Sequence, residues 1–204
     1  MRASVTNRQA PGASVSMIAR LRQETGALHT QLEKVLPLGA QLLTREHYAR
    51  FLGVMHAVVP DLEERIANVP GWSSLLPHAE QRRRAALLRC DLEVLGAHVA
   101  RAPLRCQLPV IDAPACAFGA SYVLEGSTLG GVVIARTLGP TLALTPERGL
   151  GFLCAYGSQL RERWSEFVAA LETWSASASE RERDLTVATA RATFEAFVTH
   201  ATSA

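Results

Sequence analysis

The chain has 204 residues, of which 48% are hydrophobic and 20% are charged, and its formal net charge is +2. This balance is typical of a single globular domain and excludes an intrinsically disordered chain. Because the charge is nearly neutral and no basic stripe with interleaved aromatic residues is present, we expect no nucleic-acid partner.

The first sixteen residues, MRASVTNRQAPGASVS, are rich in Ser, Ala, Pro and Gly and show no periodicity. They are predicted to form a disordered tail (residues 1–16), so that the folded domain spans residues 17–204. This tail lacks the apolar core of a signal peptide, and no run of about 18 uninterrupted apolar residues follows it. We therefore expect a cytoplasmic protein that is not associated with a membrane.

Two amphipathic helices are predicted in the first third of the domain. Apolar residues recur at helical spacing from Met17 to Pro37, and His29 lies on the apolar side of this helix. Thr44 is a suitable N-cap for a second helix, in which Pro60 could introduce a bend.

A third helix is predicted over residues 79–99, and the proline-rich stretch 102–114 predicts a connecting loop. Near the start of this helix stands the basic run Arg82, Arg83 and Arg84. Since short runs of charge are usually exposed, this run is interpreted as a solvated helix face without a function.

The second half of the chain predicts three further helices. Residues 115–138 form the most apolar segment, which contains four glycines and is expected to be a buried, strained helix. Another amphipathic helix is predicted from Pro146 to about Leu171, and a last one follows the Ser-rich segment 175–179. No β-alternation persists, so the expected fold is an all-α, single-domain bundle of six to seven helices.

The segment YVLEGSTLGG, residues 122–131, needs an explanation, because each glycine in a helix costs about 1 kcal/mol relative to alanine. Gly126 and Gly130 share one helix face, where a flat molecule or another backbone can approach closely. A phosphate loop is disfavoured, because Val132 and Val133 stand where that motif has Lys and Ser or Thr. Helix packing through small residues and a planar cofactor both remain open.

His29 has two interpretations. A lone histidine on an apolar helix face is more often a core or surface residue than a metal ligand. Glu33, however, stands one turn later on the same face, where it can hold one imidazole nitrogen and leave the other free for a metal. An ordinary surface pair is the alternative. The other histidines lack the Glu-x-x-His pairing of di-iron bundles, which disfavours a dinuclear site.

Three segments together resemble bacterial heme oxygenases, including those encoded beside bacteriophytochromes. They are residues 21–33 (LRQETGALHTQLE), 43–52 (LTREHYARFL) and 119–136 (GASYVLEGSTLGGVVIAR), and the likeness spans most of the chain after the tail. The resemblance implies a heme oxygenase-like helical domain and an oxidoreductase. Such an enzyme cleaves heme with O2 and reducing equivalents to biliverdin, CO and Fe2+, so heme is both cofactor and substrate.

The resemblance also implies roles for individual residues. His29 becomes the proximal iron ligand with Glu33 as its hydrogen-bond partner, and Arg22 lies near a heme propionate. The glycine-rich helix covers the opposite, distal side. The residues assigned to heme binding are His29, Glu33, Arg22, Tyr122, Gly126, Gly130 and Gly131, and those assigned to catalysis are Ser127, Gly126 and Gly130.

The sequence departs from its relatives at two places. Ser127 stands where animal relatives carry an aspartate that anchors ordered water; its hydroxyl can hold a water that delivers protons, but it supplies no carboxylate charge. Relatives also place basic residues for the propionates on a later helix, whereas this chain has its arginines further on, at Arg161 and Arg163. The orientation of the heme, and with it the cleaved meso carbon, is therefore open.

Partners follow from the same resemblance. An external electron donor, which is a ferredoxin, a flavodoxin or a reductase, is expected because the chain has no flavin or nicotinamide motif. A bacteriophytochrome is the expected recipient of biliverdin. The main alternative is a non-catalytic heme-binding carrier or sensor, favoured by Ser127 in place of aspartate. Two others are a thiaminase-like or quinone-biosynthesis protein and a helical interaction module, neither of which binds heme.

Overall fold

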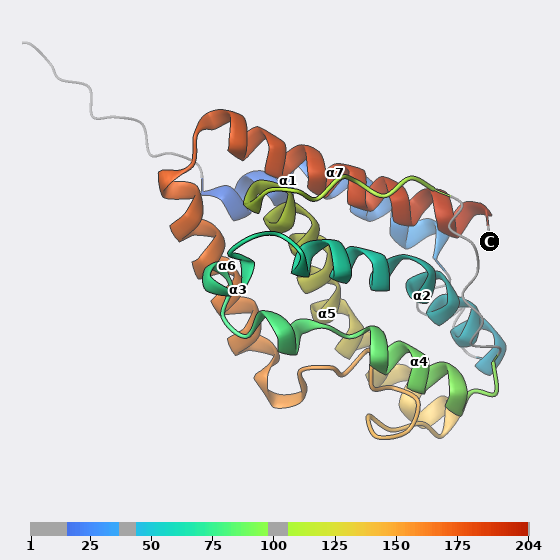
Figure 1. The fold of residues 1–204 in the computed structure, drawn as a ribbon. Helices are drawn as coiled ribbons and strands as arrows, with labels where there is room; N and C mark the ends of the chain where they lie inside the picture. Colours follow the sequence, from blue (N-terminus) through green and yellow to red (C-terminus); the bar gives the residue numbers. More distant parts are fainter. Residues whose placement is uncertain (1–15, 37–43, 98–105, 204) are drawn as a thin grey trace, which may run out of the picture.

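The computed structural model describes residues 16–36, 44–97 and 106–203 (Figure 1). Except for Ser16, the predicted tail lies outside these residues. Within the described ranges the chain forms seven α-helices and two short 3-10 helices, with no β-structure beyond isolated bridges. The predicted all-α class is confirmed.

The helices follow one another in a simple order along the chain. Their bounds are α1 Met17–Val35, α2 Arg45–Ala67, α3 Trp72–Leu75, η2 Ala79–Arg82, α4 Ala85–Val94, α5 Pro114–Leu142, η3 Gly157–Gln159, α6 Leu160–Ser177 and α7 Glu180–Ser203.

Local capping signals determine where several helices begin. The side chain of Thr44 accepts a hydrogen bond from the backbone N–H of His47 at 3.2 Å, as its N-cap role predicts. The start of α7 is a capping box: Ser179 and Glu182 bond reciprocally to each other's backbone N–H groups. Helix α2 runs through Pro60 without a break.

The third predicted helix is shorter than the sequence suggested, and it is divided. Arg83 has an extended backbone, which separates η2 from α4. Helix α4 ends at Val94, because Gly96 adopts a left-handed conformation (φ 66°) and its N–H returns to the carbonyl of Glu93. Residues 98 and 99 of the prediction lie outside the described ranges.

The helix predicted from Pro146 starts fourteen residues later, at Leu160. Gly149 (φ 93°) and Gly157 (φ 49°) both have left-handed backbones, so this stretch forms successive turns in place of a helix. The apolar periodicity that suggested a helix comes from side chains of these turns, such as Phe152, that enter the core. The predicted start of this helix is therefore wrong, whereas its second part, from Leu160 onward, is confirmed.

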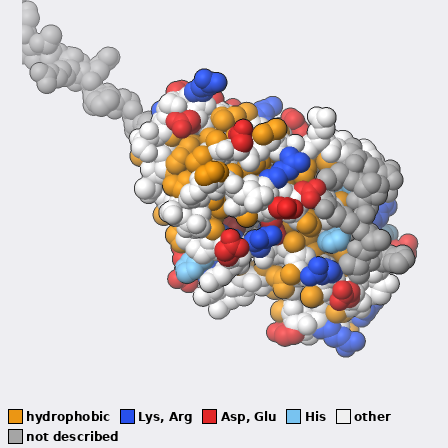
Figure 2. All heavy atoms as spheres, viewed as in Figure 1, with side chains coloured by type: hydrophobic (Ala, Val, Ile, Leu, Met, Phe, Trp, Pro, Cys, Tyr) orange, Lys and Arg blue, Asp and Glu red, His pale blue; other side chains and the backbone are white. Residues whose placement is uncertain are grey.

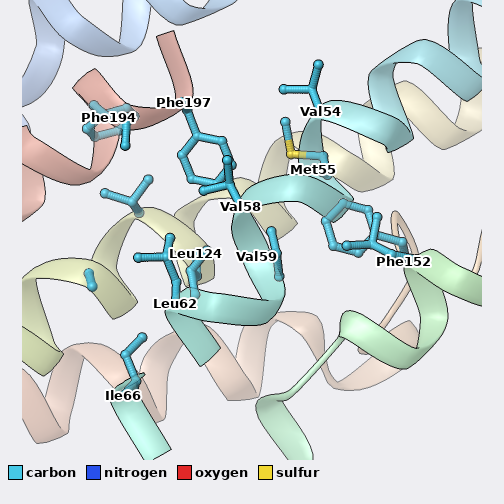
Figure 3. Packing of buried hydrophobic residues seen from close by; sticks show 14 of the residues in the cluster. Val54, Met55, Val58, Val59, Leu62, Ile66, Leu124, Phe152, Phe194 and Phe197 are labelled. Atoms are coloured by element: carbon cyan, nitrogen blue, oxygen red, sulfur yellow. The ribbon is translucent and has the colours of Figure 1, made fainter. Parts of the chain in front are cut away.

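Helix α7 supports the two helices that matter most for the site. Both α1 and α5 pack along it, and α1 lies beside α7 in Figure 1. Close packing of α5 depends on Gly119, since a Cβ there would collide with the backbone carbonyl of Thr186. In Figure 3, Val58 and Leu62 of α2 converge with Leu124 of α5 and Phe197 of α7 to form the core.

Helix α5 is the centre of the bundle. Among the described residues it is the one helix long and apolar enough to cross a membrane, but 61% of the relevant window is buried inside the protein. Its apolar composition is thus that of a core helix. On the face drawn in Figure 2, acidic and basic side chains are interspersed and form no continuous patch of one sign.

Candidate functional site

A cavity of about 430 Å³ lies between α1 and α5, within the volume range of small-molecule sites. It exists because α1 and α5 both pack on α7 but make little contact with each other. Its walls are mostly apolar. Phe51, Met55 and Val59 of α2 and Phe194 and Phe197 of α7 contribute to them.

Helix α1 forms one wall. Arg22, His29 and Glu33 share its cavity face because they are spaced by seven and four residues. The His29 side chain is 59% exposed, and its Nδ1 lies 3.7 Å from a carboxylate oxygen of Glu33, which is longer than a hydrogen bond. Phe194 of α7 meets the imidazole edge-on, with ring centroids 5.9 Å apart, and limits the orientation of that ring.

His29 is the only histidine of the described ranges that lines the cavity. His47, His56, His78 and His200 lie elsewhere in the fold, and His98 is outside the described residues. An imidazole that is accessible from a largely apolar cavity can bind a metal ion through whichever nitrogen is unprotonated.

Helix α5 forms the opposite wall, and every residue from Tyr122 to Gly131 except Glu125 lines the cavity. A Cβ added at Gly126 or Gly130 would meet no atom within 4 Å, so these glycines face open space. Helix packing through small residues therefore does not explain them. Gly131 differs, because a Cβ there would lie 2.9 Å from the backbone carbonyl oxygen of Leu153.

Ser127 shares this wall with Arg84. The Ser127 hydroxyl donates to the carbonyl of Leu124 at 2.6 Å, and the Arg84 guanidinium donates to the same carbonyl at 2.7 Å and to Ser127 Oγ at 3.3 Å. Arg84 also lies over the ring of Phe152, with its guanidinium carbon 4.9 Å from the ring centroid. Its Nε is buried without a hydrogen-bond partner.

Carboxylates beneath the wall hold Arg84 and Phe152 in place. Glu63 accepts hydrogen bonds from the backbone N–H groups of Arg84 and Ala85, at the start of α4. Asp91 accepts from the backbone N–H groups of Gly151 and Phe152. Burial raises the pKa of both carboxyl groups, and the backbone hydrogen bonds oppose that shift only in part.

The interpretation of the basic run was wrong for two of its three members. Arg82 and Arg84 are 6% and 2% exposed, whereas the Arg83 side chain is 49% exposed. The sequence-based reasoning thus missed Arg84, a cationic residue of the cavity wall. The lone Glu125 in the most apolar helix was the available signal that buried cations lie nearby.

The cationic groups of the cavity are few. Arg22 and Arg84 are the arginines that line it among the described residues, while Arg161 and Arg163 do not. Arg163 instead bonds to Gln81 at 2.8 Å. Together with one imidazole, the Tyr122 hydroxyl and broad apolar walls, these groups suit a flat, largely apolar ligand with a metal centre and acidic substituents.

Comparisons with known proteins agree on one family. The family model described as heme oxygenase matches residues 15–202. A curated protein of Xanthomonas campestris pv. campestris (strain 8004), described as heme oxygenase, is 34% identical over 150 residues, which cover 71% of this chain and 83% of that protein.

Two solved structures share the fold. The NO- and CO-bound heme oxygenase from Neisseria meningitidis matches with a TM-score of 0.80 and 20% identity, over 93% of this chain and 92% of its own. The heme oxygenase from Leptospira interrogans matches with a TM-score of 0.69 and 17% identity, over 93% of this chain and 100% of its own.

Proposed function

Because this chain belongs to the heme oxygenase family, we propose that its cavity binds heme between α1 and α5, with His29 as the iron ligand. The protein is a heme-degrading enzyme. Its reaction cleaves heme oxidatively with O2 and reducing equivalents, and the products are biliverdin, CO and Fe2+. The glycine-rich stretch of α5, from Gly126 to Gly130, covers the side of the heme opposite His29.

The observation that carries this proposal is the position of His29 on the wall opposite Gly126 and Gly130. Heme is flat and apolar, and it needs a nitrogen ligand on one face and free space on the other. The cavity offers one accessible histidine on α1 and, across it, two glycines whose missing side chains leave open space. Bound heme supplies the redox-active iron at which O2 is reduced while the porphyrin is cleaved.

Glu33 is proposed to orient the His29 imidazole. Its carboxylate is already 3.7 Å from Nδ1, and both side chains are more than half exposed, so small rotations can close a hydrogen bond. A proton held at Nδ1 by this carboxylate leaves Nε2 unprotonated and free for iron. Glu33 also makes the imidazole a better electron donor.

Ser127 and Arg84 are proposed to organise water on the opposite wall. The Ser127 hydroxyl uses its proton on the Leu124 carbonyl and one lone pair on the Arg84 guanidinium, so its second lone pair can accept a hydrogen bond from water. The Arg84 guanidinium has only donors and already donates to the Leu124 carbonyl and to Ser127 Oγ, so it can orient water beside the hydroxyl as a hydrogen-bond donor. Ordered water held by Ser127 and nearby carbonyls then delivers protons.

The acidic groups of heme are proposed to meet Arg22 and Tyr122. Both line the cavity, and the exposed guanidinium of Arg22 can pair with a carboxylate at the solvent edge. Gly131 is proposed to contact heme as well. The proposal further includes a cytoplasmic location, a ferredoxin, flavodoxin or reductase as electron donor, and a bacteriophytochrome as a recipient of biliverdin.

Heme reconstitution and single turnover test the assignment of His29. Wild-type protein loaded with heme and given an electron donor in air should lose its Soret band and yield biliverdin, whose isomer chromatography identifies. His29→Ala should bind heme with an altered spectrum and form no biliverdin, and added imidazole should restore the spectrum. His47→Ala, an exposed residue outside the cavity, is the matched control. A His29→Ala spectrum equal to that of wild type would overturn the proposal.

A further inference from the structure

Glu125 is the one residue between Tyr122 and Gly131 that does not line the cavity. It is the only acidic residue of α5, and it stands directly before Gly126. Its side chain is 5% exposed. A carboxylate so deeply buried in an apolar helix is costly and needs strong partners.

Both carboxylate oxygens of Glu125 are bound by residues from outside α5. One accepts a hydrogen bond from the Tyr156 hydroxyl at 2.8 Å, and the other accepts one from the Arg82 guanidinium at 2.7 Å. Tyr156 belongs to the turns before η3, and Arg82 belongs to η2. The backbone of α5 is therefore tied at this point to two distant segments.

Arg82 is itself fixed from three further directions. It donates to a carboxylate oxygen of Glu166 at 2.9 Å, to the backbone carbonyl of Arg163 at 3.1 Å and to the backbone carbonyl of Pro77 at 2.9 Å. Its side chain is 4% exposed. Because Glu166 and Arg163 belong to α6, the Glu125 carboxylate connects α5 to α6 through a single rigid side chain.

The course of α5 near the cavity needs such an anchor. Glycine favours many backbone conformations, and three glycines stand between residues 126 and 131. In addition, Ser127 and Thr128 donate their hydroxyl protons to the carbonyls of Leu124 and Glu125, a bonding pattern that competes with regular helix geometry. The helical backbone hydrogen bonds alone therefore do not fix the conformation of α5 in this segment.

We propose that Glu125 is a positioning residue: its buried contacts with Arg82 and Tyr156 set the rotation of α5 and the distance at which Gly126, Ser127 and Gly130 approach the heme. This inference rests on the proposed function, because it assumes that heme occupies the cavity beside these residues. An apolar contact of similar volume could supply the same stability, but two directed hydrogen bonds also fix an orientation.

Amide hydrogen exchange of the protein without heme tests the anchor. Glu125→Gln should raise the exchange rate of residues 126–131 about tenfold relative to wild type, because a local opening costs less there. Glu166→Gln is the matched control, since it removes the other carboxylate charge that Arg82 contacts but has no bond to α5. It should leave exchange in this segment unchanged. Tyr156→Phe, which deletes a single hydroxyl, should give a smaller increase and serves if Glu125→Gln does not fold.

The heme-loaded protein provides a second readout that a purely structural role would not change. Glu125→Gln and Tyr156→Phe should shift the C–O stretching frequency of bound CO, which reports the polar groups around it, and should change the ratio of biliverdin isomers. Glu166→Gln should change neither. Lower thermal stability with unchanged exchange, stretching frequency and isomer ratio would overturn the inference. Failure of the wild type to bind heme would instead overturn the proposed function, since the exchange experiment uses no heme.

Discussion

A guanidinium nitrogen of Arg84 lies 3.3 Å from the hydroxyl oxygen of Ser127, and both groups donate to the Leu124 carbonyl. This pair places a guanidinium beside a hydroxyl on the cavity wall of α5. The arrangement is rigid, because Phe152 stacks on the guanidinium and Glu63 fixes the Arg84 backbone.

Arg84 should therefore be required for turnover but not for heme binding. Arg84→Lys keeps a charge but loses the planar guanidinium that lies over Phe152 and donates to Leu124 and Ser127, and we expect its rate of biliverdin formation to fall about tenfold or more. Heme affinity, for which we propose His29 as the main determinant, should change little. Arg83→Lys, at the exposed neighbour, is the control. Equal rates for the two variants at equal heme occupancy would contradict this role.

Gly126 and Gly131 stand five positions apart on α5 and should respond to substitution by alanine in opposite ways. Gly126→Ala adds a methyl group to open space and should stabilise the protein without heme by up to about 1 kcal/mol, because alanine favours a helix. The same methyl group should weaken heme binding. Heme titration and thermal unfolding of the variant measure the two effects.

Gly131→Ala is the counterpart. Its Cβ would press on the Leu153 carbonyl oxygen at 2.9 Å, so we expect a loss of about 1–3 kcal/mol in the free energy of unfolding without heme. Denaturant unfolding of Gly126→Ala, Gly131→Ala and wild type measures these differences in the free energy of unfolding. A destabilised Gly126→Ala, or a Gly131→Ala as stable as wild type, would show that the two positions are assigned wrongly.

Arg22 and Arg20 are two residues apart on α1, and their substitution should affect different properties: heme affinity for Arg22 and thermal stability for Arg20. Arg22 lines the cavity, so Arg22→Ala should weaken heme affinity by no more than about fivefold, the usual range for an exposed ion pair. Arg20 pairs with Glu24, Glu180 and Asp184 and joins α1 to α7 away from the cavity. Arg20→Ala should lower the melting temperature and leave heme affinity intact. The reverse pattern would refute the assignment of Arg22.

Asp91 should give the stability a recognisable pH dependence. Burial raises the pKa of this carboxyl above its usual value of 3.8, so the folded state binds its proton more readily than the unfolded state does. Stability supplied by the protonated form is present below that value and is lost as the pH rises through the raised pKa. As the pH rises from about 3.8 through the raised pKa of Asp91, the free energy of unfolding of wild type should therefore fall relative to that of Asp91→Asn. Unfolding curves at several pH values measure the difference, and a constant difference would contradict the prediction.

The sequence predicted the first two helices well because their signals are local. Thr44 caps its own helix, and the apolar periodicity before Pro37 belongs to one continuous segment. The turns between Pro146 and Leu160 were predicted as helix because their apolar residues have helical spacing by coincidence, while Gly149 and Gly157 control the backbone.

The candidate site was predictable only in part for a different reason. His29 and the glycine-rich segment stand out in the sequence, and the structure brings both to one cavity. The burial of Arg82 and Arg84 depends on Glu125 and Leu124, about forty residues away along the chain. Nothing in the basic run itself distinguishes its buried members from the exposed Arg83.

Helix α7 is the common support on which α1 and α5, the two helices that face each other across the cavity, both pack. The distance between α1 and α5 depends on where each helix packs on α7. For α5, one such contact is that of Gly119 with the backbone at Thr186 and Ala190. Side-chain size at the α7 positions that meet Gly119 can therefore change the width of the cavity between α1 and α5. Substitutions at Thr186 or Ala190, neither of which lines the cavity, thus offer a means of changing its width without altering any residue of its wall.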